Sequence, residues 1–204
     1  MKIICIGRNY MAHIKELNHS VPVKPIFFFK PDSALLQKNS PFYYPDFSNE
    51  IHYETEIVVR IDKIGKSISP EYSNLHYSEI ALGLDLTARD IQRYEIENSL
   101  PWTLSKAFDY SAPISKFFPI SDFSNNIQDI NFKLYKNNEL VQNSNTSDMI
   151  FTIDYLISYI SQFISLKVGD LIFTGTPPGV GEIKIGDKLQ GYIENNKVLE
   201  CEIK

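Results

Sequence analysis

Three acidic residues stand in otherwise apolar stretches of the chain, and their types and spacing could serve metal chemistry. Glu54 and Glu56 lie in the stretch 52–61, whose β-branched and aromatic residues predict a strand. Residues two apart on a strand share a face, so these two carboxylates would repel and raise each other's pKa. Asp85 lies near the end of the apolar run 80–86, a predicted buried strand. A buried ionised carboxylate is costly unless it is paired with a cation or bound to a metal.

Two interpretations of these acids are open at this point. In the first, Glu54, Glu56 and Asp85 form one divalent-metal site, because three hard oxygen donors suit Mg²⁺ or Mn²⁺ better than Zn²⁺. In the second, the two glutamates lie on the wet face of an edge strand, while Asp85 pairs with Arg89 or caps a helix. Spacing alone favours the second interpretation, since Glu-x-Glu is common on half-exposed strands.

His13 and Glu16 form a candidate proton-transfer pair. They lie in residues 11–17, a run of fair helix formers that we expect to end at Asn18. At a spacing of i,i+3 on a helix the two side chains can hydrogen-bond, and the carboxylate would then orient the imidazole as a general base. The alternative is an exposed contact of little consequence, which the pattern by itself favours.

The residues that follow Asp85 predict a helix with polar groups on one face. Thr87 is a suitable N-cap for it. Arg89 and Gln92 would then share a helix face and could point back toward the corner that carries Asp85. A solvated position in the first helical turn is the alternative for Arg89.

Lys106 is the one cation of the apolar segment 101–108. It could snorkel, with its stem along the apolar side chains and its ammonium group in water. It could instead point its charge at an anionic ligand. The sequence slightly favours snorkelling.

The segment 174–181 is rich in glycine and follows a short predicted strand, 171–173. It has no Gly-Lys-Ser/Thr motif and opens no helix, so it is neither a Walker A loop nor a dinucleotide-binding fingerprint. Its glycines permit a ligand to approach the backbone closely, and Thr174 and Thr176 add hydroxyl groups. A strained β-connection without function is the alternative.

Most other elements are predicted to be short strands. The longest predicted helix is 153–164, where isoleucine and leucine recur at helical spacing. Asn137-Asn138 is typical of a hairpin turn. The remaining strands are expected at 2–6, 25–31, 130–141 (a hairpin), 188–194 and 198–203, and a loop is expected over 37–48.

The composition is that of an ordinary globular protein with one domain, residues 1–204. Its formal net charge of −5, with no basic cluster, argues against a nucleic-acid or anionic-membrane surface. Cys5 and Cys201 have no paired spacing, which favours a reducing compartment. The apolar-rich segment 149–166 is interrupted by polar residues, and no signal peptide is evident. We therefore expect a soluble, cytoplasmic protein.

Seven short motifs occur in an order that is specific as a set. The chain resembles the fumarylacetoacetate hydrolase family, in its short single-domain acylpyruvase and oxaloacetate decarboxylase branch. This resemblance covers nearly the whole chain. It favours the functional interpretation of each motif above over the non-functional alternative. The motifs are Gly7-Arg8-Asn9-Tyr10, His13-x-x-Glu16, Lys30-Pro31, His52-Tyr53-Glu54-Thr55-Glu56, Asp85-Leu86-Thr87-Ala88-Arg89-Asp90, Pro101-Trp102-Thr103-Leu104-Ser105-Lys106 and 174–181.

The resemblance implies an α+β, predominantly β fold: a mixed β-sandwich roll with a few short helices, usually a homodimer. It implies that the three acids hold Mg²⁺, with Mn²⁺ possible. The other implied site residues fall into two groups. The catalytic residues are His13, Glu16 and Lys106, with the first two on a lid over the substrate, and the substrate-binding residues are Arg8, Arg89, Gln92 and Thr176.

The implied activity is cleavage of a C–C bond in a small 2-oxo acid. The metal would act as a Lewis acid that stabilises a pyruvate enolate, formed by acylpyruvate hydrolysis or by oxaloacetate decarboxylation. The enzyme alternative is an isomerase or keto–enol tautomerase at the same site, of the oxaloacetate tautomerase or 2-hydroxyhepta-2,4-diene-1,7-dioate isomerase type. The non-enzyme alternative is a β-rich binding module whose acids hold a stabilising ion.

Overall fold

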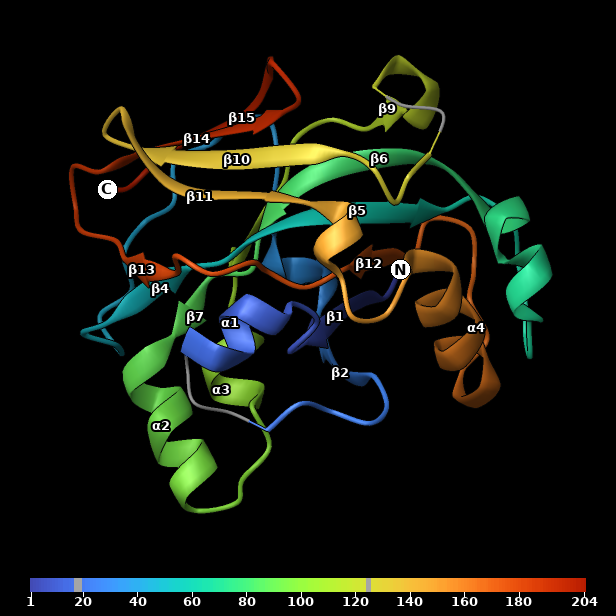
Figure 1. The fold of residues 1–204 in the computed structure, drawn as a ribbon. Helices are drawn as coiled ribbons and strands as arrows, with labels where there is room; N and C mark the ends of the chain where they lie inside the picture. The colour runs from blue at the N-terminus through green and yellow to red at the C-terminus, as the bar shows by residue number, and fades with distance from the viewer. Residues whose placement is uncertain (17–19, 124–125) are drawn as a thin grey trace.

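The computed structural model describes residues 1–16, 20–123 and 126–204 and shows a predominantly β protein with a few short helices (Figure 1). Its largest sheet has six strands, and the acidic residues lie on or directly next to two of them, β5 (Thr55–Ile61) and β6 (Tyr77–Leu84). The β1–β12 pair is parallel, whereas the other neighbours in this sheet run antiparallel. The order is β2 (Ile26–Lys30), β1 (Ile3–Gly7), β12 (Leu171–Phe173), β5 (Thr55–Ile61), β6 (Tyr77–Leu84) and β9 (Phe118–Pro119).

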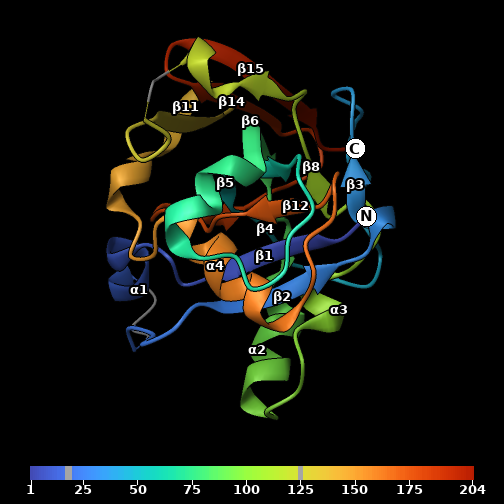
Figure 2. The same cartoon turned by 90° about the vertical axis from the view of Figure 1, so that its right-hand side faces the viewer.

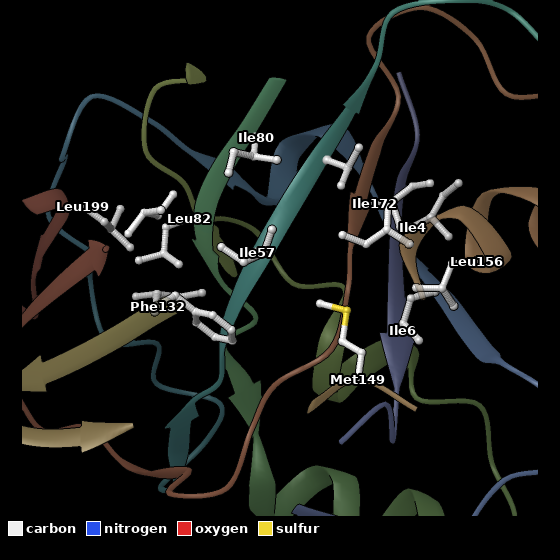
Figure 3. Packing of buried hydrophobic residues seen from close by; sticks show 14 of the residues in the cluster. Ile4, Ile6, Ile57, Ile80, Leu82, Phe132, Met149, Leu156, Ile172 and Leu199 are labelled. Carbon is white, nitrogen blue, oxygen red and sulfur yellow. The ribbon is translucent and has the colours of Figure 1, made fainter. Parts of the chain in front are cut away.

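A four-stranded antiparallel sheet packs across β5 and β6 on one side. Its order is β11 (Glu139–Asn145), β10 (Asn131–Lys136), β14 (Lys188–Ile193) and β15 (Asn196–Glu202). Phe132 and Leu199 of this sheet meet Ile57 and Leu82 of the larger one (Figure 3). Gly191 permits the close approach, because a Cβ there would collide with the Leu82 side chain. The two sheets thus enclose one apolar core, as a sandwich-like roll requires.

Helix α4 (Ile153–Phe163) covers the β1–β12 part of the large sheet. Its buried face carries Leu156, which lies beside Ile4, Ile6 and Ile172 in the same core (Figure 3). The predicted apolar stripe of this helix is therefore confirmed as core. None of the helices in the described ranges is long and apolar enough to cross a membrane.

Three short helices and a small three-stranded sheet lie at the end of the large sheet where Glu54 and Asp85 lie. Helices α2 (Arg89–Glu97) and α3 (Thr103–Lys106) lie on the opposite side of the large sheet from the four-stranded sheet (Figures 1 and 2). The other elements are α1 (Met11–Glu16), a small sheet of β13 (Gly181–Glu182), β4 (Ile51–Tyr53) and β7 (Thr87–Ala88), the parallel pair β3 (Leu35–Leu36) and β8 (Ala112–Pro113), and the 3-10 helices η1 (Asp32–Ala34), η2 (Pro70–His76), η3 (Ile120–Asp122) and η4 (Thr146–Asp148).

The hairpin between β10 and β11 follows the sequence prediction closely. Asn137 and Asn138 both have positive φ, 53° and 68°. This left-handed pair is typical of the tight turns that match strand twist. The short predicted helix is also confirmed over Met11–Glu16, whereas Leu17 and the stop at Asn18 lie outside the described residues.

Two local predictions were wrong. The stretch 52–61 is not one strand, because the chain leaves the small sheet after β4 and enters the large sheet at β5, with Glu54 at the break. Thr87 does not cap α2, since it lies in β7 and its Oγ1 donates to the Asp85 carbonyl at 3.1 Å. Helix α2 begins instead after Ala88, which provides no side-chain cap.

Candidate active site

Three buried carboxylates converge at one end of β5 and β6. Glu54, Glu56 and Asp85 each offer a carboxylate oxygen, and these oxygens all lie within 4.8 Å of one another. The side chains are buried, with exposed fractions of 6%, 1% and 1% for their residues. The antiparallel register that places Thr55 opposite Leu84 brings the two segments together, and the Asp85 N–H donates to the Glu54 carbonyl at 2.8 Å.

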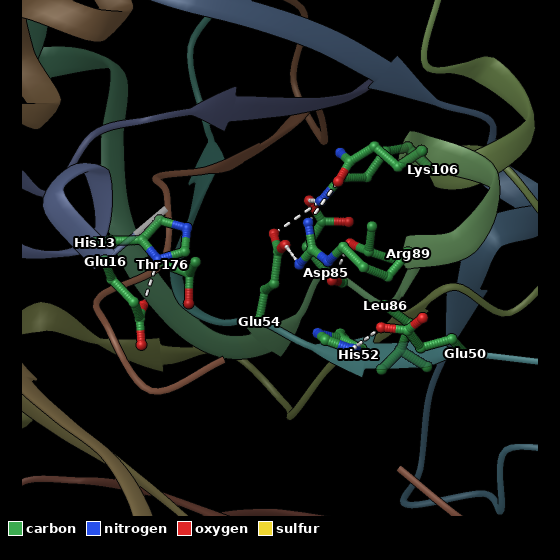
Figure 4. A network of polar contacts seen from close by, with 12 residues as sticks. His13, Glu16, Glu50, His52, Glu54, Asp85, Leu86, Arg89, Lys106 and Thr176 are labelled. Carbon is green, nitrogen blue, oxygen red and sulfur yellow. Dashed lines mark hydrogen bonds and ion pairs between the residues drawn. The ribbon is translucent and has the colours of Figure 1, made fainter. Parts of the chain in front are cut away.

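Cationic side chains from three other elements meet two of these acids (Figure 4). Lys106 of α3 donates from Nζ to Glu54 Oε2 and to Asp85 Oδ2, at 2.7 Å each. Arg89 of α2 donates to Glu54 Oε1 at 2.5 Å. Lys30, the last residue of β2, forms an ion pair with Asp85 Oδ1 at 2.8 Å. Lys106 is only 3% exposed, so the snorkelling interpretation was wrong.

Glu56 differs from its two neighbours because no cation within the described parts of the chain pairs with it. Its Oε2 accepts the Gly175 backbone N–H at 2.7 Å. Burial, reinforced by the negative charges of Asp85 and Glu54, raises the pKa of Glu56 well above its usual range. The single backbone hydrogen bond only partly offsets this effect.

Glu54 shows the opposite shift, which corrects the expectation that the two glutamates raise each other's pKa. Burial acts to raise the pKa of Glu54, but the charges of Lys106 and Arg89 outweigh it and hold the pKa well below its usual range. For Lys106, burial acts to lower the pKa, and Asp85 and Glu54 reverse this and raise it. Lys106 is therefore a charged ammonium inside the protein.

The chemistry of the cluster fits an oxygen-preferring divalent cation. Its three ligand atoms are carboxylate oxygens, the donor type that Mg²⁺ and Mn²⁺ prefer. Among the described residues, Glu56 is the carboxylate of the cluster without a positive partner, so a cation at this point would relieve the repulsion that raises its pKa. The residues present therefore fit the metal that the sequence resemblance implies.

His13 and Glu16 lie together on α1, across the cluster from Lys106 and Arg89 (Figure 4). His13 Nδ1 and Glu16 Oε2 are 3.1 Å apart, and His13 is 6% exposed. Both Glu16 carboxylate oxygens also accept the Gly179 N–H, at 3.1 and 3.3 Å. The glycine-rich segment thus holds the carboxylate that orients the imidazole.

Gly179 can take this position because it is glycine. Its φ is +95°, and a Cβ there would collide with the Val141 carbonyl. The segment 174–181 therefore lies against the candidate site and contacts its carboxylates. Gly175 and Gly179 connect it to Glu56 on one side and to Glu16 on the other.

A cavity of about 50 Å³ lies between the acids and α1. Its polar lining includes the side chains expected to bind substrate: Arg8, Arg89, Gln92 and Thr176, together with His13 and Lys106. Its apolar wall comes from Ile6, Phe28, Ile96 and Trp102. Every candidate site residue of the sequence interpretation is accounted for at this cavity except Glu16, which stands behind His13.

Hydrogen bonds within the protein already occupy some of the donors and acceptors of Gln92 and Thr176. Arg89 donates to the Gln92 side-chain carbonyl, which leaves the Gln92 amide N–H₂ without a partner among the described residues. Thr176 donates its hydroxyl proton to the Thr55 carbonyl at 2.9 Å and accepts from Gln142 at 2.9 Å. The Thr176 hydroxyl therefore has no free proton to offer a ligand.

Lys30 is the site residue whose role the sequence did not indicate. It is 2% exposed, and its ammonium group contacts Asp85, the Leu86 carbonyl at 3.3 Å, Ser111 Oγ at 2.9 Å and the Lys106 carbonyl. Lys30 therefore holds the Asp85 carboxylate in place, together with the backbone of Lys106, which pairs with the same carboxylate. The signal in the sequence is a lysine that closes a short aromatic strand, Ile26–Lys30.

The sheet arrangement and the carboxylate cluster together define a protein of the fumarylacetoacetate hydrolase class, as the motif order implied. The model for "Fumarylacetoacetate (FAA) hydrolase C-terminal" matches residues 2–204, and the chain belongs to this family. The expected fold is thereby confirmed.

Relatives carry several activities. The mouse protein named oxaloacetate tautomerase FAHD1, mitochondrial, is 41% identical over 206 residues, covering 99% of this chain and 91% of that protein. The Dictyostelium discoideum oxaloacetate decarboxylase, mitochondrial, is 41% identical, covering 93% of this chain and 87% of that protein. The crystal structure of fumarylpyruvate hydrolase from Pseudomonas aeruginosa in complex with Mn²⁺ and pyruvate has a TM-score of 0.94 and 35% identity, covering 100% of this chain and 89% of that one.

Proposed function

We propose that this protein is a divalent-metal-dependent enzyme that moves a proton on a small 2-oxo acid, with keto–enol tautomerisation of oxaloacetate as its main reaction. The observation that carries the proposal is the placement of two chemically different groups on opposite sides of one small cavity. The carboxylate cluster with Lys106 lies on one side, and the His13–Glu16 pair lies on the other. The names of the mouse and Dictyostelium relatives support oxaloacetate as substrate.

Glu54, Glu56 and Asp85 would hold Mg²⁺ or Mn²⁺, and the P. aeruginosa relative was crystallised with Mn²⁺ and pyruvate. Such an ion supplies Lewis-acid stabilisation of negative charge on a 2-oxo group. The fit rests on the donor set and on the missing positive partner of Glu56.

Lys106 and Gln92 would bind and orient the substrate. The Lys106 ammonium has three N–H donors, and Glu54 and Asp85 accept two of them. The third would bind the 2-oxo oxygen, where negative charge develops as the C3 proton leaves. The free Gln92 amide would donate to the adjacent carboxylate, with Arg89 held beside it by Gln92 and Glu54.

His13 would carry the proton. In the keto-to-enol direction the imidazole removes a proton from C3, the C–H electron pair forms the C2–C3 double bond, and the carbonyl pair moves onto the 2-oxo oxygen. That oxygen then takes up a proton from water to give the enol, and the imidazolium releases the C3 proton to water, which restores the neutral imidazole. Glu16, fixed by Gly179, would hold the imidazole in the orientation that this transfer needs.

C–C cleavage is the second candidate function. The same electron flow toward the 2-oxo oxygen accompanies loss of CO₂ from oxaloacetate, the reaction named for the Dictyostelium relative. In hydrolysis, the reaction type named for the P. aeruginosa relative, His13 would deprotonate an attacking water.

A panel of 2-oxo acids tests the proposal. Oxaloacetate, acetylpyruvate and fumarylpyruvate are incubated with the protein in Mg²⁺, Mn²⁺ or excess chelator, while enol absorbance and pyruvate release are followed together. We expect metal-dependent tautomerisation of oxaloacetate that is faster than any release of pyruvate. Pyruvate release at a comparable or higher rate would favour the cleavage candidate, and full activity in chelator would exclude the metal-dependent mechanism.

The His13→Gln variant separates an enzyme from a metal-stabilised binding module. Loss of the proton-transfer group should lower kcat by about 10²–10⁴-fold, with little change in the unfolding temperature. A matched control is His52→Gln, because His52 pairs with Glu50 at 2.9 Å and does not line the cavity. An unchanged kcat in His13→Gln would contradict the assigned role.

The expected assembly and location also stay predictions. A homodimer is tested by light scattering of the eluted protein at several concentrations. The mouse and Dictyostelium relatives are named mitochondrial, whereas a cytoplasmic location is what we expect from the sequence. Fractionation of the producing cells distinguishes the two.

A further inference from the structure

Arg8 is the cation of the cavity lining that the protein itself does not neutralise. Lys106, Arg89 and Lys30 each form an ion pair with Glu54 or Asp85. Arg8 also lines the cavity, yet it forms no ion pair within the described ranges. Its Nε is buried and has no hydrogen-bond partner in the part of the chain that the structure describes. A buried donor of this kind is uncommon and indicates a partner supplied from outside the chain.

The backbone holds Arg8 in a conformation that few residues adopt. Its φ is +60°, in the left-handed region. The next residue, Asn9, is 1% exposed and fixes the turn by donating to the carbonyls of Phe151 and Thr174, at 3.1 and 2.8 Å, and accepting the Phe151 N–H at 2.8 Å. A strained position that its surroundings fix so firmly is typical of a functional residue.

Arg8 belongs to the side of the cavity that carries the proton-transfer pair. It follows β1 directly and precedes α1, the helix of His13. Lys106 and Arg89 lie on the other side of Glu54 (Figure 4). A substrate bound at one end by Lys106 and the acid cluster would therefore extend its other end toward the segment of Arg8 and His13.

The charges of the site indicate what that other end carries. Glu54, Glu56 and Asp85 contribute three negative charges when ionised, and Lys30, Lys106 and Arg89 contribute three positive charges. A divalent ion adds two positive charges, and Arg8 adds one. A substrate with a single carboxylate leaves this excess largely unneutralised, whereas one with two carboxylates neutralises most of it and offers Arg8 a planar bidentate partner.

We propose that Arg8 binds the second carboxylate of a dicarboxylic 2-oxo acid and thereby selects such substrates over monocarboxylic ones. This inference rests on the proposed function, since it names the substrate class of the same site. Arg8 acts here as a substrate-binding residue. It takes no part in the proton transfer assigned to His13.

The test compares two substrates that differ only at the distal group. Oxaloacetate and 2-oxosuccinamate, in which an amide replaces the distal carboxylate, are assayed with Mg²⁺ and the wild-type, Arg8→Gln and Arg8→Lys proteins. We expect Arg8→Gln to lower kcat/KM for oxaloacetate by about 10- to 150-fold, mainly through KM, because a hydrogen-bonded charge pair is lost. The kcat/KM for 2-oxosuccinamate should change less than about threefold. Arg8→Lys should have an intermediate kcat/KM for oxaloacetate, because lysine keeps the positive charge but cannot bind a carboxylate in the bidentate geometry of a guanidinium group.

Arg93→Gln is the matched control for the loss of one guanidinium. Arg93 lies on α2, pairs with Glu50 at 2.5 Å and does not line the cavity. It should leave both substrates unaffected. Equal losses for the two substrates in Arg8→Gln, or no loss for oxaloacetate, would overturn the inference.

Ligand-induced thermal shifts of the Mg²⁺-loaded protein give the same comparison without turnover. Wild-type protein should be stabilised more by oxaloacetate than by 2-oxosuccinamate, and Arg8→Gln should abolish the difference. A wild-type protein that binds but converts neither compound would contradict the proposed reaction while still testing Arg8. Equal shifts from the two compounds in wild-type protein would contradict the role of Arg8 alone.

Discussion

The side chains of strands β5 and β6 have different surroundings in the middle of the pair and at one end. In the middle of the pair, Ile57 and Leu82 are fully buried among other apolar side chains. At one end the same two strands place Glu56 and Asp85 in an equally buried position, where the neighbours are charged. The first region gains stability from removing apolar surface from water, at about 25 cal/mol per Å². The second holds like charges together at a cost in stability, which a bound ion would offset.

The comparison shows where stability and chemistry reside in this fold. The apolar region is expected to tolerate changes that leave catalysis intact, provided that the protein remains folded. In the charged region, neutralising Glu56 should abolish catalysis while hardly affecting, or even increasing, the stability of the metal-free protein, whereas removing a buried cation such as Lys30 should lower that stability. Substitutions in each region therefore test whether this contrast holds.

The largest effect is expected when a carboxylate of the cluster is neutralised. Glu56→Gln and Asp85→Asn should each lower kcat/KM by at least about 10³-fold, because the Lewis acid would lose a charged ligand. Steady-state kinetics and calorimetric titration with Mg²⁺ measure the loss of activity and of metal affinity together.

Glu79→Gln is the matched control on the same strand. Glu79 lies on β6 and pairs with Arg60 outside the cluster. It should keep both turnover and metal binding. Near wild-type activity in Glu56→Gln or Asp85→Asn would remove the acid cluster from the mechanism.

A large loss of stability is expected at Lys30. Lys30→Met removes the cation from Asp85 Oδ1 and leaves Ser111 and two carbonyls without their buried donor. Breaking a buried pair from one side costs about 3–5 kcal/mol. Urea unfolding of the metal-free protein measures this value.

Lys188→Met is the corresponding exposed substitution. Lys188 is 43% exposed in its side chain and pairs with Glu200 at 2.9 Å. Loss of this pair should cost at most about 1 kcal/mol. If the two lysine variants were equally stable, the buried network around Lys30 would not contribute as described.

The apolar region should show the reverse pattern. Leu156 on α4 is fully buried against β1 and β12, so Leu156→Ala should lower the free energy of unfolding by about 2–5 kcal/mol. Its kcat/KM per folded molecule should stay within about twofold of wild type. Unfolding curves and kinetics on the same sample test this pair of statements, and a specific loss of kcat would show that the two regions are coupled.

Elements with strong local signals could be predicted from the sequence. The apolar periodicity of α4 and the paired asparagines between β10 and β11 determine those elements locally, and the structure confirms both. The break at Glu54 could not be predicted in this way. It depends on β4 and β5 pairing with different sheets, which is a property of the whole fold.

The candidate site likewise has features that could be predicted from the sequence and features that could not. Convergence of Glu54, Glu56 and Asp85 was one of two interpretations that the residues left open, and the order of the motifs, not their spacing, favoured it. The pKa shifts could not be inferred, since their opposite signs depend on which acids Lys106 and Arg89 reach. The role of Lys30 likewise could not be predicted, because its partners lie 55 or more residues away along the chain.

The smallest expected effect concerns the pH dependence of the metal-free protein. The pKa of Glu56 is raised in the folded state by burial and by Asp85 and Glu54, above the ordinary value of 4.5 expected after unfolding. The unfolded chain therefore releases this proton first as the pH rises. The contribution of Glu56 to stability is complete below about pH 4.5 and is lost as the pH rises through the folded-state pKa.

Glu56→Gln removes this dependence, because glutamine stays neutral. In chelator, the variant should become more stable than wild type as the pH rises through the folded-state pKa of Glu56. The difference between the two unfolding free energies reports the titration of Glu56 together with its effect on the neighbouring carboxylates Glu54 and Asp85. At saturating Mg²⁺ the order should reverse, because metal at 100 times its Kd adds about 2.7 kcal/mol to wild type alone. A difference independent of both pH and Mg²⁺ would mean that Glu56 is a structural residue, and the charged end of β5 would then not differ from its core.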